Sequence, residues 1–253
     1  MDKDIFSLLI VLTFGHILGD FLFQTTKDVQ NKHRFGVLFK HAAIVGFLSY
    51  VVTGLPQCWP IMIAVALAHF FIDLGKVFAK KSWQDHELSL FFIDQAAHLL
   101  SILLITWALL SYFPCICSGG WWSEKTGLLY LKLMIIIGGF ILSVRAGAMV
   151  MEMAVRPFLC QLKIDDLNLR KGLENGGRFI GQLERALIYL FVLAGQPNAI
   201  GFLIAAKSIL RFGEIKDGTN RMEAEYIIIG TFMSFFLGLV VAFGAQRLLE
   251  LLK

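Results

Sequence analysis

Charged side chains are scarce in this chain: Asp, Glu, Lys and Arg make up 17% of its 253 residues, whereas 57% of the residues are hydrophobic. So little charge excludes a soluble domain, and the mean hydropathy of +0.70 is typical of a polytopic membrane protein. The formal net charge of +4 comes from clusters between the apolar runs. We therefore interpret this positive charge as a determinant of membrane topology and of contact with anionic lipid, because no nucleic-acid-binding motif is present.

Cysteine is also rare, with four residues in the chain. Cys115 and Cys117 form a C-x-C motif without a partner pair, which is a poor metal motif. We interpret the cysteines as small loop residues, or as one optional disulfide that includes Cys58. A nucleophile elbow and a Ser-His-Asp order are likewise missing, which disfavours covalent catalysis.

The apolar runs predict an all-α polytopic membrane protein with about 7–8 transmembrane helices, because a spanning helix needs roughly 20 residues. The first run is too long for a signal-peptide core and lacks a cleavage site after it, so we expect it to be retained. The seventh is short, is interrupted near Gln196, and could be re-entrant. The expected helices cover residues 4–24, 35–55, 60–79, 89–113, 125–149, 178–196, 198–212 and 225–250.

Basic residues alternate between the loops: they follow the first and third helices, and the loop at 53–59 has none. The positive-inside rule then predicts a multi-pass protein of the bacterial inner membrane with its N-terminus outside. We expect a four-helix bundle in residues 1–113 and a second bundle in residues 114–253. Residues 161–177 are polar and predict a cytoplasmic connection with a short amphipathic helix.

Seven ionisable residues lie within the apolar runs, where such groups cost energy and are functional candidates. Six form His/Asp pairs four residues apart, so each pair shares one helix face. The order within the third pair is reversed, and so is the expected direction of its helix. Antiparallel helices would therefore bring all seven groups to one depth near the cytoplasmic face. The residues are His16 and Asp20, His69 and Asp73, Asp94 and His98, and the single His41.

These residue types bind divalent metals, and three carboxylates with neutral imidazoles leave about three negative charges in a low-dielectric bundle. One or two divalent transition-metal ions would compensate that charge, and seven ligands suit two bridged ions. A mixed His/Asp set does not distinguish zinc, manganese and iron. One competing interpretation is a hydrogen-bond network of about 0.6 kcal/mol per contact, with Lys40 and Lys76 neutralising two aspartates. Another is a proton or cation pathway.

A cationic group in the C-terminal half comprises Arg178, Arg185, Lys207 and Arg211. Arginine pairs with phosphate through its fork of donors, and lysine serves as a point charge. The group predicts a site for an anionic or phosphorylated substrate, or for a lipid head group. Positive-inside anchoring, with Glu184 paired to an arginine, is the competing interpretation.

Several motifs resemble a bacterial inner-membrane family, Domain of Unknown Function 3307. They are His16-Ile-Leu-Gly-Asp20-Phe-Leu-Phe-Gln24, His41, His69-Phe-Phe-Ile-Asp73, Asp94-Gln-Ala-Ala-His98, Gly177-Arg-Phe-Ile-Gly-Gln-Leu-Glu-Arg185 and Gly201-Phe-Leu-Ile-Ala-Ala-Lys-Ser-Ile-Leu-Arg211-Phe. The resemblance implies a fold and a site, but no activity. The N-terminal pattern is also loosely similar to LexA-regulated, membrane-bound metal-dependent hydrolases.

The pattern favours an intramembrane metal-dependent hydrolase of a lipid or phosphoester, in which the metal activates water. A divalent-cation transporter or sensor would also explain the His/Asp set, but it explains the cationic group poorly. A structural membrane protein without catalytic activity is the third hypothesis.

Overall fold

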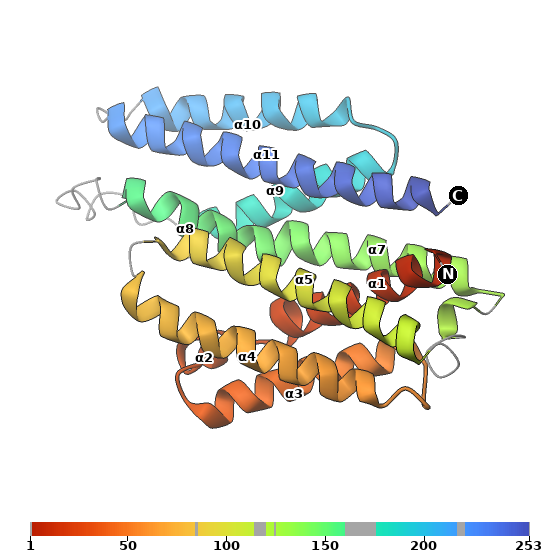
Figure 1. The fold of residues 1–253 in the computed structure, drawn as a ribbon. Coiled ribbons are helices and arrows are strands. Elements are labelled where there is room, and N and C mark those ends of the chain that lie inside the picture. The colour runs from red at the N-terminus through yellow and green to blue at the C-terminus, as the bar shows by residue number, and fades with distance from the viewer. Residues whose placement is uncertain are drawn as a thin grey trace. The chain divides into compact units, whose positions relative to one another are not determined.

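The computed structural model describes residues 2–83, 86–113, 120–123, 125–159, 176–216 and 221–252, without the side chains of 2, 3, 210–216, 221 and 223. The described residues form helices and connecting turns and contain no strand (Figure 1). Six helical segments among them are long and apolar enough to cross a membrane, judged by length and composition. This confirms the predicted all-α membrane fold.

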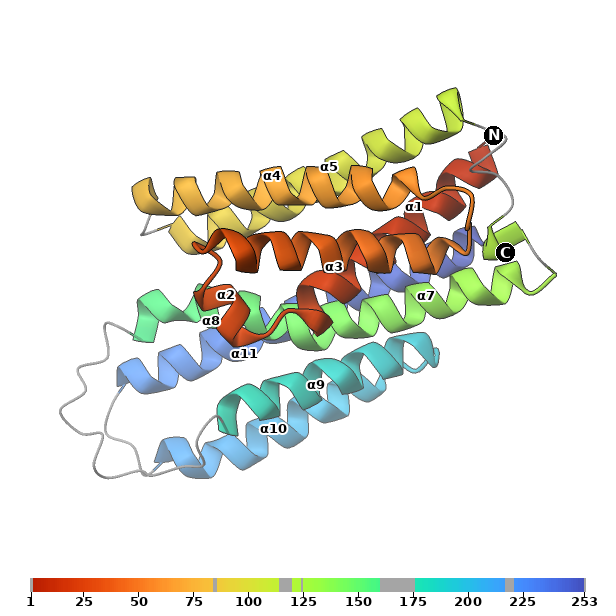
Figure 2. The same ribbon diagram turned by 90° about the horizontal axis from the view of Figure 1, so that it is seen from below.

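The chain divides into two compact units, residues 1–141 and residues 142–251. In the first unit, α1 contacts α3, α5 and α7, while α4 contacts α3 and α5 (Figure 2). The helix α7, expected in the second bundle, thus packs in the first unit. The elements are α1 (Asp2–Ile17), the π-helix η1 (Leu18–Phe23), α2 (Thr26–Gln30), α3 (Phe35–Thr53), α4 (Pro60–Ser82), α5 (Glu87–Tyr112), the 3-10 turn η3 (Trp121–Ser123) and α7 (Gly127–Ile141).

Two glycines, four residues apart, bring the first helical segment close to α3. A Cβ atom added at Gly15 would lie 2.7 Å from the Cα of Ser49, and one at Gly19 would lie 2.5 Å from a methyl group of Val45. Small residues at this spacing allow membrane helices to approach closely. The approach places the His16 and Asp20 side of the first segment beside α3.

Cys58, in the turn between α3 and α4, is disulfide-bonded and 1% exposed. This agrees with one of the two interpretations of the cysteines, a disulfide that includes Cys58. The other three cysteines, Cys115, Cys117 and Cys160, lie outside the described residues.

The second unit consists of the π-helix η4 (Leu142–Ala146), α8 (Gly147–Leu159), α9 (Gly176–Leu193), α10 (Ala199–Lys216) and α11 (Arg221–Leu251). In this unit α9 contacts α8, α10 and α11, and α11 also contacts α8 (Figure 1). The expected helix 125–149 extends to Leu159 and contains the π-helical η4. The predicted spans at 178–196 and 198–212 form α9 and α10, which are not among the six candidate spans of the described residues. Most of the predicted connection 161–177 lies outside the described residues.

Candidate metal centre

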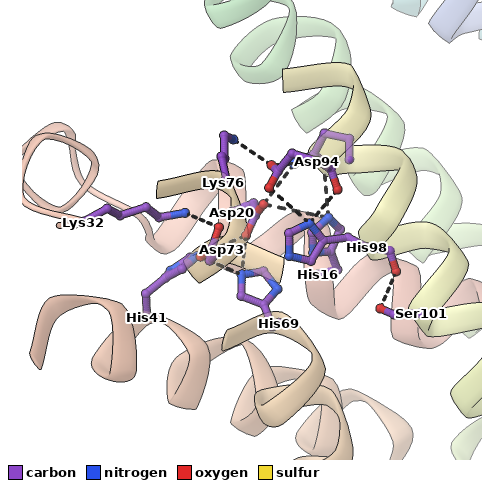
Figure 3. Close-up of polar contacts among 11 residues, drawn as sticks. His16, Asp20, Lys32, His41, His69, Asp73, Lys76, Asp94, His98 and Ser101 are labelled. Atoms are coloured by element: carbon purple, nitrogen blue, oxygen red, sulfur yellow. Dashed lines mark hydrogen bonds and ion pairs between the residues drawn. The ribbon is translucent and has the colours of Figure 1, made fainter. Parts of the chain in front are cut away.

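The structure brings the seven predicted His and Asp residues together in the first unit (Figure 3). They come from four elements: α1 with η1, α3, α4 and α5. Each of the seven is at most 8% exposed. Ligand atoms lie within 4.8 Å of one another in three overlapping groups: His16, Asp20 and His69; His41, His69 and Asp73; and Asp73, Asp94 and His98.

Two triangles of ligand atoms share the edge between His41 and His69, whose Nε2 atoms are 3.0 Å apart. Asp20 Oδ1 completes the first triangle, at 3.2 Å from His41 Nε2 and 3.3 Å from His69 Nε2. Asp73 Oδ2 completes the second, at 3.6 and 3.5 Å from the same two atoms. Ligand atoms bound about 2.0–2.1 Å from one tetrahedral ion are about 3.3–3.4 Å apart. Either triangle therefore has the spacing of three ligands on one ion.

The remaining three residues lie next to these triangles. The rings of His16 and His98 stack with centroids 4.9 Å apart, and the rings of His69 and His98 lie 4.2 Å apart. His98 Nδ1 is 2.8 Å from the backbone carbonyl of Asp94. Because a carbonyl only accepts, Nδ1 carries the proton of the neutral ring and Nε2 keeps a free lone pair.

Five buried polar atoms of the cluster make no hydrogen bond. Buried polar groups are normally bonded, and leaving one unpaired costs free energy. Five such carboxylate oxygens and ring nitrogens in one cluster are atoms that could coordinate a metal ion. They are His16 Nδ1, Asp20 Oδ1, Asp73 Oδ2, Asp94 Oδ1 and His98 Nε2.

One oxygen of each aspartate accepts a hydrogen bond or ion pair from a side chain outside the seven residues. Lys32 Nζ is 2.8 Å from Asp73 Oδ1, and Lys76 Nζ is 2.7 Å from Asp94 Oδ2. Gln95 Nε2 donates to Asp20 Oδ2 and to Asp94 Oδ2, both at 3.2 Å. In each carboxylate the second oxygen is one of the unbonded atoms. Such outer partners fix the orientation of metal ligands in known sites.

Gln95 also lies 3.2 Å from His16, through its Oε1 and the His16 Nε2. Gln95 and Lys32 were not among the residues predicted from the sequence. Their signals are indirect, because Gln95 follows Asp94 in the motif Asp94-Gln-Ala-Ala-His98 and Lys32 belongs to the basic loop after the first helix.

The prediction that Lys40 neutralises a site aspartate is wrong. Lys40 Nζ lies 3.0 Å from Asp28 Oδ1, outside the cluster. Hydrogen bonds from Thr25 and then from Lys40 lower the pKa of Asp28 to about 2. Lys76 does pair with Asp94, as proposed, and Lys32 takes the place expected for Lys40. Two lysines against three carboxylates leave one excess negative charge instead of about three, so the charge balance no longer favours a second divalent ion.

Asp20 lies in the π-helix η1. This element begins directly after α1, which carries His16 in its last turn. A π-helical turn widens the backbone, and such segments are frequent at functional sites. Here the turn carries the carboxylate that approaches both His41 and His69.

Three of the four predicted cationic residues line one cavity of the second unit: Arg178, Arg185 and Lys207. Lys207 Nζ pairs with Glu184 Oε2 at 2.7 Å. The prediction that Glu184 pairs with an arginine is therefore wrong. Arg178 is exposed and lies 3.8 Å from Glu152. The side chain of Arg211 lies outside the described residues.

The fold and the buried His/Asp cluster together define a helical membrane protein whose clustered ligands could hold a metal ion. Residues 8–118 match the family described as "Protein of unknown function (DUF3307)". This is the family that the sequence motifs resemble, and the matched segment contains all seven His and Asp residues. The quoted motifs at 177–185 and 201–212 lie outside the matched segment. Neither the search of curated proteins nor the search of solved structures found a match.

Proposed function

We propose that the first unit binds one divalent transition-metal ion between His41 and His69, and that the protein is a membrane-embedded hydrolase of a lipid or phosphoester. The observation that carries the proposal is the pair of triangles with edges of 3.0–3.6 Å that share these two histidines. Two histidines and one carboxylate are the ligand set of several hydrolytic zinc enzymes and of non-haem iron sites. Zinc, manganese and iron all suit it.

The residues of the cluster would divide the work. His41 and His69 hold the ion, with Asp20 or Asp73 as the third ligand, while Gln95 and Lys32 orient those carboxylates. A bound divalent ion would polarise a scissile bond and lower the pKa of a water molecule. His98, with its free Nε2, is placed to hold or pass a proton beside the ligands.

The lysines favour a hydrolase over a cation transporter. Lys32 and Lys76 lie against two carboxylates of the cluster, those of Asp73 and Asp94, and their side chains are 14% and 29% exposed. Cations at the border of the cluster would repel a divalent ion that passes through it. The same cations would attract an anionic substrate such as a phosphoester.

The disulfide supports the proposed orientation in a bacterial inner membrane. Disulfides persist in oxidising compartments such as the periplasm. Cys58 lies in the turn that the positive-inside rule places outside the cell. The N-terminus would then lie outside, and the aspartate ends of the three pairs would face the cytoplasm.

The test is an assay of the detergent-purified protein, stripped of metal and reloaded with zinc, manganese or iron(II). We expect metal-dependent hydrolysis of an aryl phosphodiester or of phospholipid in mixed micelles. His69→Ala should abolish it, whereas the exposed His86→Ala should not. In proteoliposomes the reloaded metal should not cross the bilayer. Metal flux without hydrolysis would contradict the proposal and favour the transporter.

A further inference from the structure

The second unit contains a cavity of about 580 Å³ that plays no part in the His/Asp cluster. Its walls come from α8, α9 and α11, with Lys207 from α10. Six charged side chains line it, four cationic and two acidic: Arg156, Arg178, Arg185, Lys207, Glu152 and Glu184. The lining therefore carries a net positive charge within an otherwise largely apolar wall.

Arg185 is the unusual member of this lining, because it is only 2% exposed. Its Nε donates to the Ser143 carbonyl at 2.9 Å, and its Nη1 donates to Ser234 Oγ at 2.7 Å. Ser143 belongs to the π-helix η4. The guanidinium is thus fixed by neutral acceptors that balance none of its charge.

Glycines surround the Arg185 side chain. A Cβ atom at Gly147 would lie 2.8 Å from Nε, one at Gly181 would lie 3.3 Å from Nη1, and one at Gly238 would lie 3.4 Å from Cγ. Larger residues at these positions would crowd or displace the side chain. The site is therefore built around an arginine in a fixed orientation.

No carboxylate of the described residues lies within salt-bridge distance of Arg185. The adjacent Glu184 is paired with Lys207 at 2.7 Å, and both of those side chains are largely buried. A buried charge without a counter-charge is costly. Among the described residues, the hydrogen bonds of Arg185 use Nε and Nη1. We therefore assign Nη2 as the donor to an anion in the cavity.

The surroundings of the cavity indicate the rest of the ligand. Ile180 lines the cavity and is 50% exposed, and it lies on α9 beside the exposed Phe179 and close to the exposed Leu183. Met151, Val155 and Ile227 add apolar lining. An anion alone would not use these surfaces, whereas a lipid with an anionic head and an acyl chain would.

We infer that this cavity binds one acidic phospholipid. Arg185 would bind its phosphodiester, and one acyl chain would extend out of the cavity along Ile180. Arginine suits the phosphodiester because its fork offers several donors to the oxygens. The inference requires only the membrane fold, so it stands or falls independently of the metal centre.

The test is native mass spectrometry of the full chain in detergent, with added phosphatidylglycerol or phosphatidylcholine of matched acyl chains. Both lipids carry a phosphodiester, but choline adds a cation that the net positive lining would repel. We therefore expect one tightly bound phosphatidylglycerol per chain and binding of phosphatidylcholine weaker by roughly tenfold or more. Arg185→Gln should weaken the binding of phosphatidylglycerol by a similar factor, because it removes the donor to the phosphodiester. Equal binding of both lipids would overturn the inference.

A second test fills the cavity with a larger side chain and leaves Arg185 unchanged. Gly230 lines the cavity, and a Cβ there would meet only Val155, at 3.9 Å. Gly230→Leu should therefore fold and lose the lipid, whereas Gly244→Leu, on the same helix with open space at its Cβ, should keep it. Retention of the lipid by Gly230→Leu would overturn the site. Inorganic phosphate should not displace the lipid at millimolar concentration, and complete displacement would show that the anion alone is recognised.

Discussion

His41 and His69 face each other through their Nε2 atoms at 3.0 Å, although they belong to α3 and α4 and are 28 residues apart. Two neutral rings can share one hydrogen at that distance, but the nearby oxygens of Asp20 and Asp73 then have no hydrogen-bond donor. One cation between the rings would satisfy both nitrogens and at least one carboxylate. This relationship is the basis of the proposed metal site.

The close contact between the first helical segment and α3 should not tolerate a larger side chain. We expect Gly15→Leu to lower the stability by about 1–3 kcal/mol or more, because a Cβ there would strike the Ser49 backbone. Thermal unfolding in detergent measures the effect. Gly36→Leu, at an open position on α3, is the control and should unfold near the wild-type temperature. Equal melting of both variants would refute the proposed role of Gly15.

Removal of a lysine should have opposite effects on stability and on metal affinity. Lys76→Met leaves Asp94 without its cation, which should cost the metal-free protein about 1–3 kcal/mol, given the partial exposure of the pair. The extra negative charge should tighten divalent-metal binding, so added metal should restore much of the melting temperature. The exposed Lys80→Met, whose ion pair with Glu87 is 3.5 Å long, should change neither quantity. Weaker metal binding by Lys76→Met would count against the site.

Gln95 should act on the metal through the residues that it orients. Gln95→Leu removes its contacts with His16, Asp20 and Asp94 while it keeps a similar volume. Loss of such an outer partner typically weakens metal affinity about 10–100-fold. A competition titration with a metal-binding dye measures this value. Saturating metal should still fill the site, and an unchanged affinity would show that Gln95 has no orienting role.

The orientation predicts one-sided labelling at two exposed loop positions. With the native cysteines replaced, Thr26→Cys should react with membrane-impermeant thiol reagents only from the cytoplasm. Gln57→Cys should react only from outside. Labelling of intact cells and of inverted vesicles separates the two sides. The reverse pattern would invert the topology, and access to position 26 from both sides would favour a transporter.

The His/Asp convergence could be predicted because i, i+4 spacing fixes a helix face and the reversed third pair matches an antiparallel helix. The ion pair of Lys32 with Asp73 could not, because it joins a loop to a helix 41 residues away. Simple periodicity also assumes α-helical geometry, so it could not reveal the π-helical turns at Asp20 and Ser143. The spacing of Gly15 and Gly19 is that of a helix-packing motif, but the sequence does not specify that α3 is the partner helix.

In the second unit the sequence placed Arg185 and Lys207 in one cationic group with Arg178 and Arg211. It could not show that Lys207 neutralises Glu184 while Arg185 is held by neutral acceptors. That distinction depends on contacts between different helices, and sequence spacing does not specify them.

The metal content of the purified chain tests the central claim most directly. After metal loading and removal of excess, elemental analysis of the wild-type protein should give about one transition-metal ion per chain, the number that we propose for the shared histidine pair. The double variant His41→Ala/His69→Ala should bind none, while His33→Ala/His86→Ala, which removes two exposed histidines, should bind as the wild type does. A wild-type protein without metal after loading, or equal occupancy in the two double variants, would contradict the account.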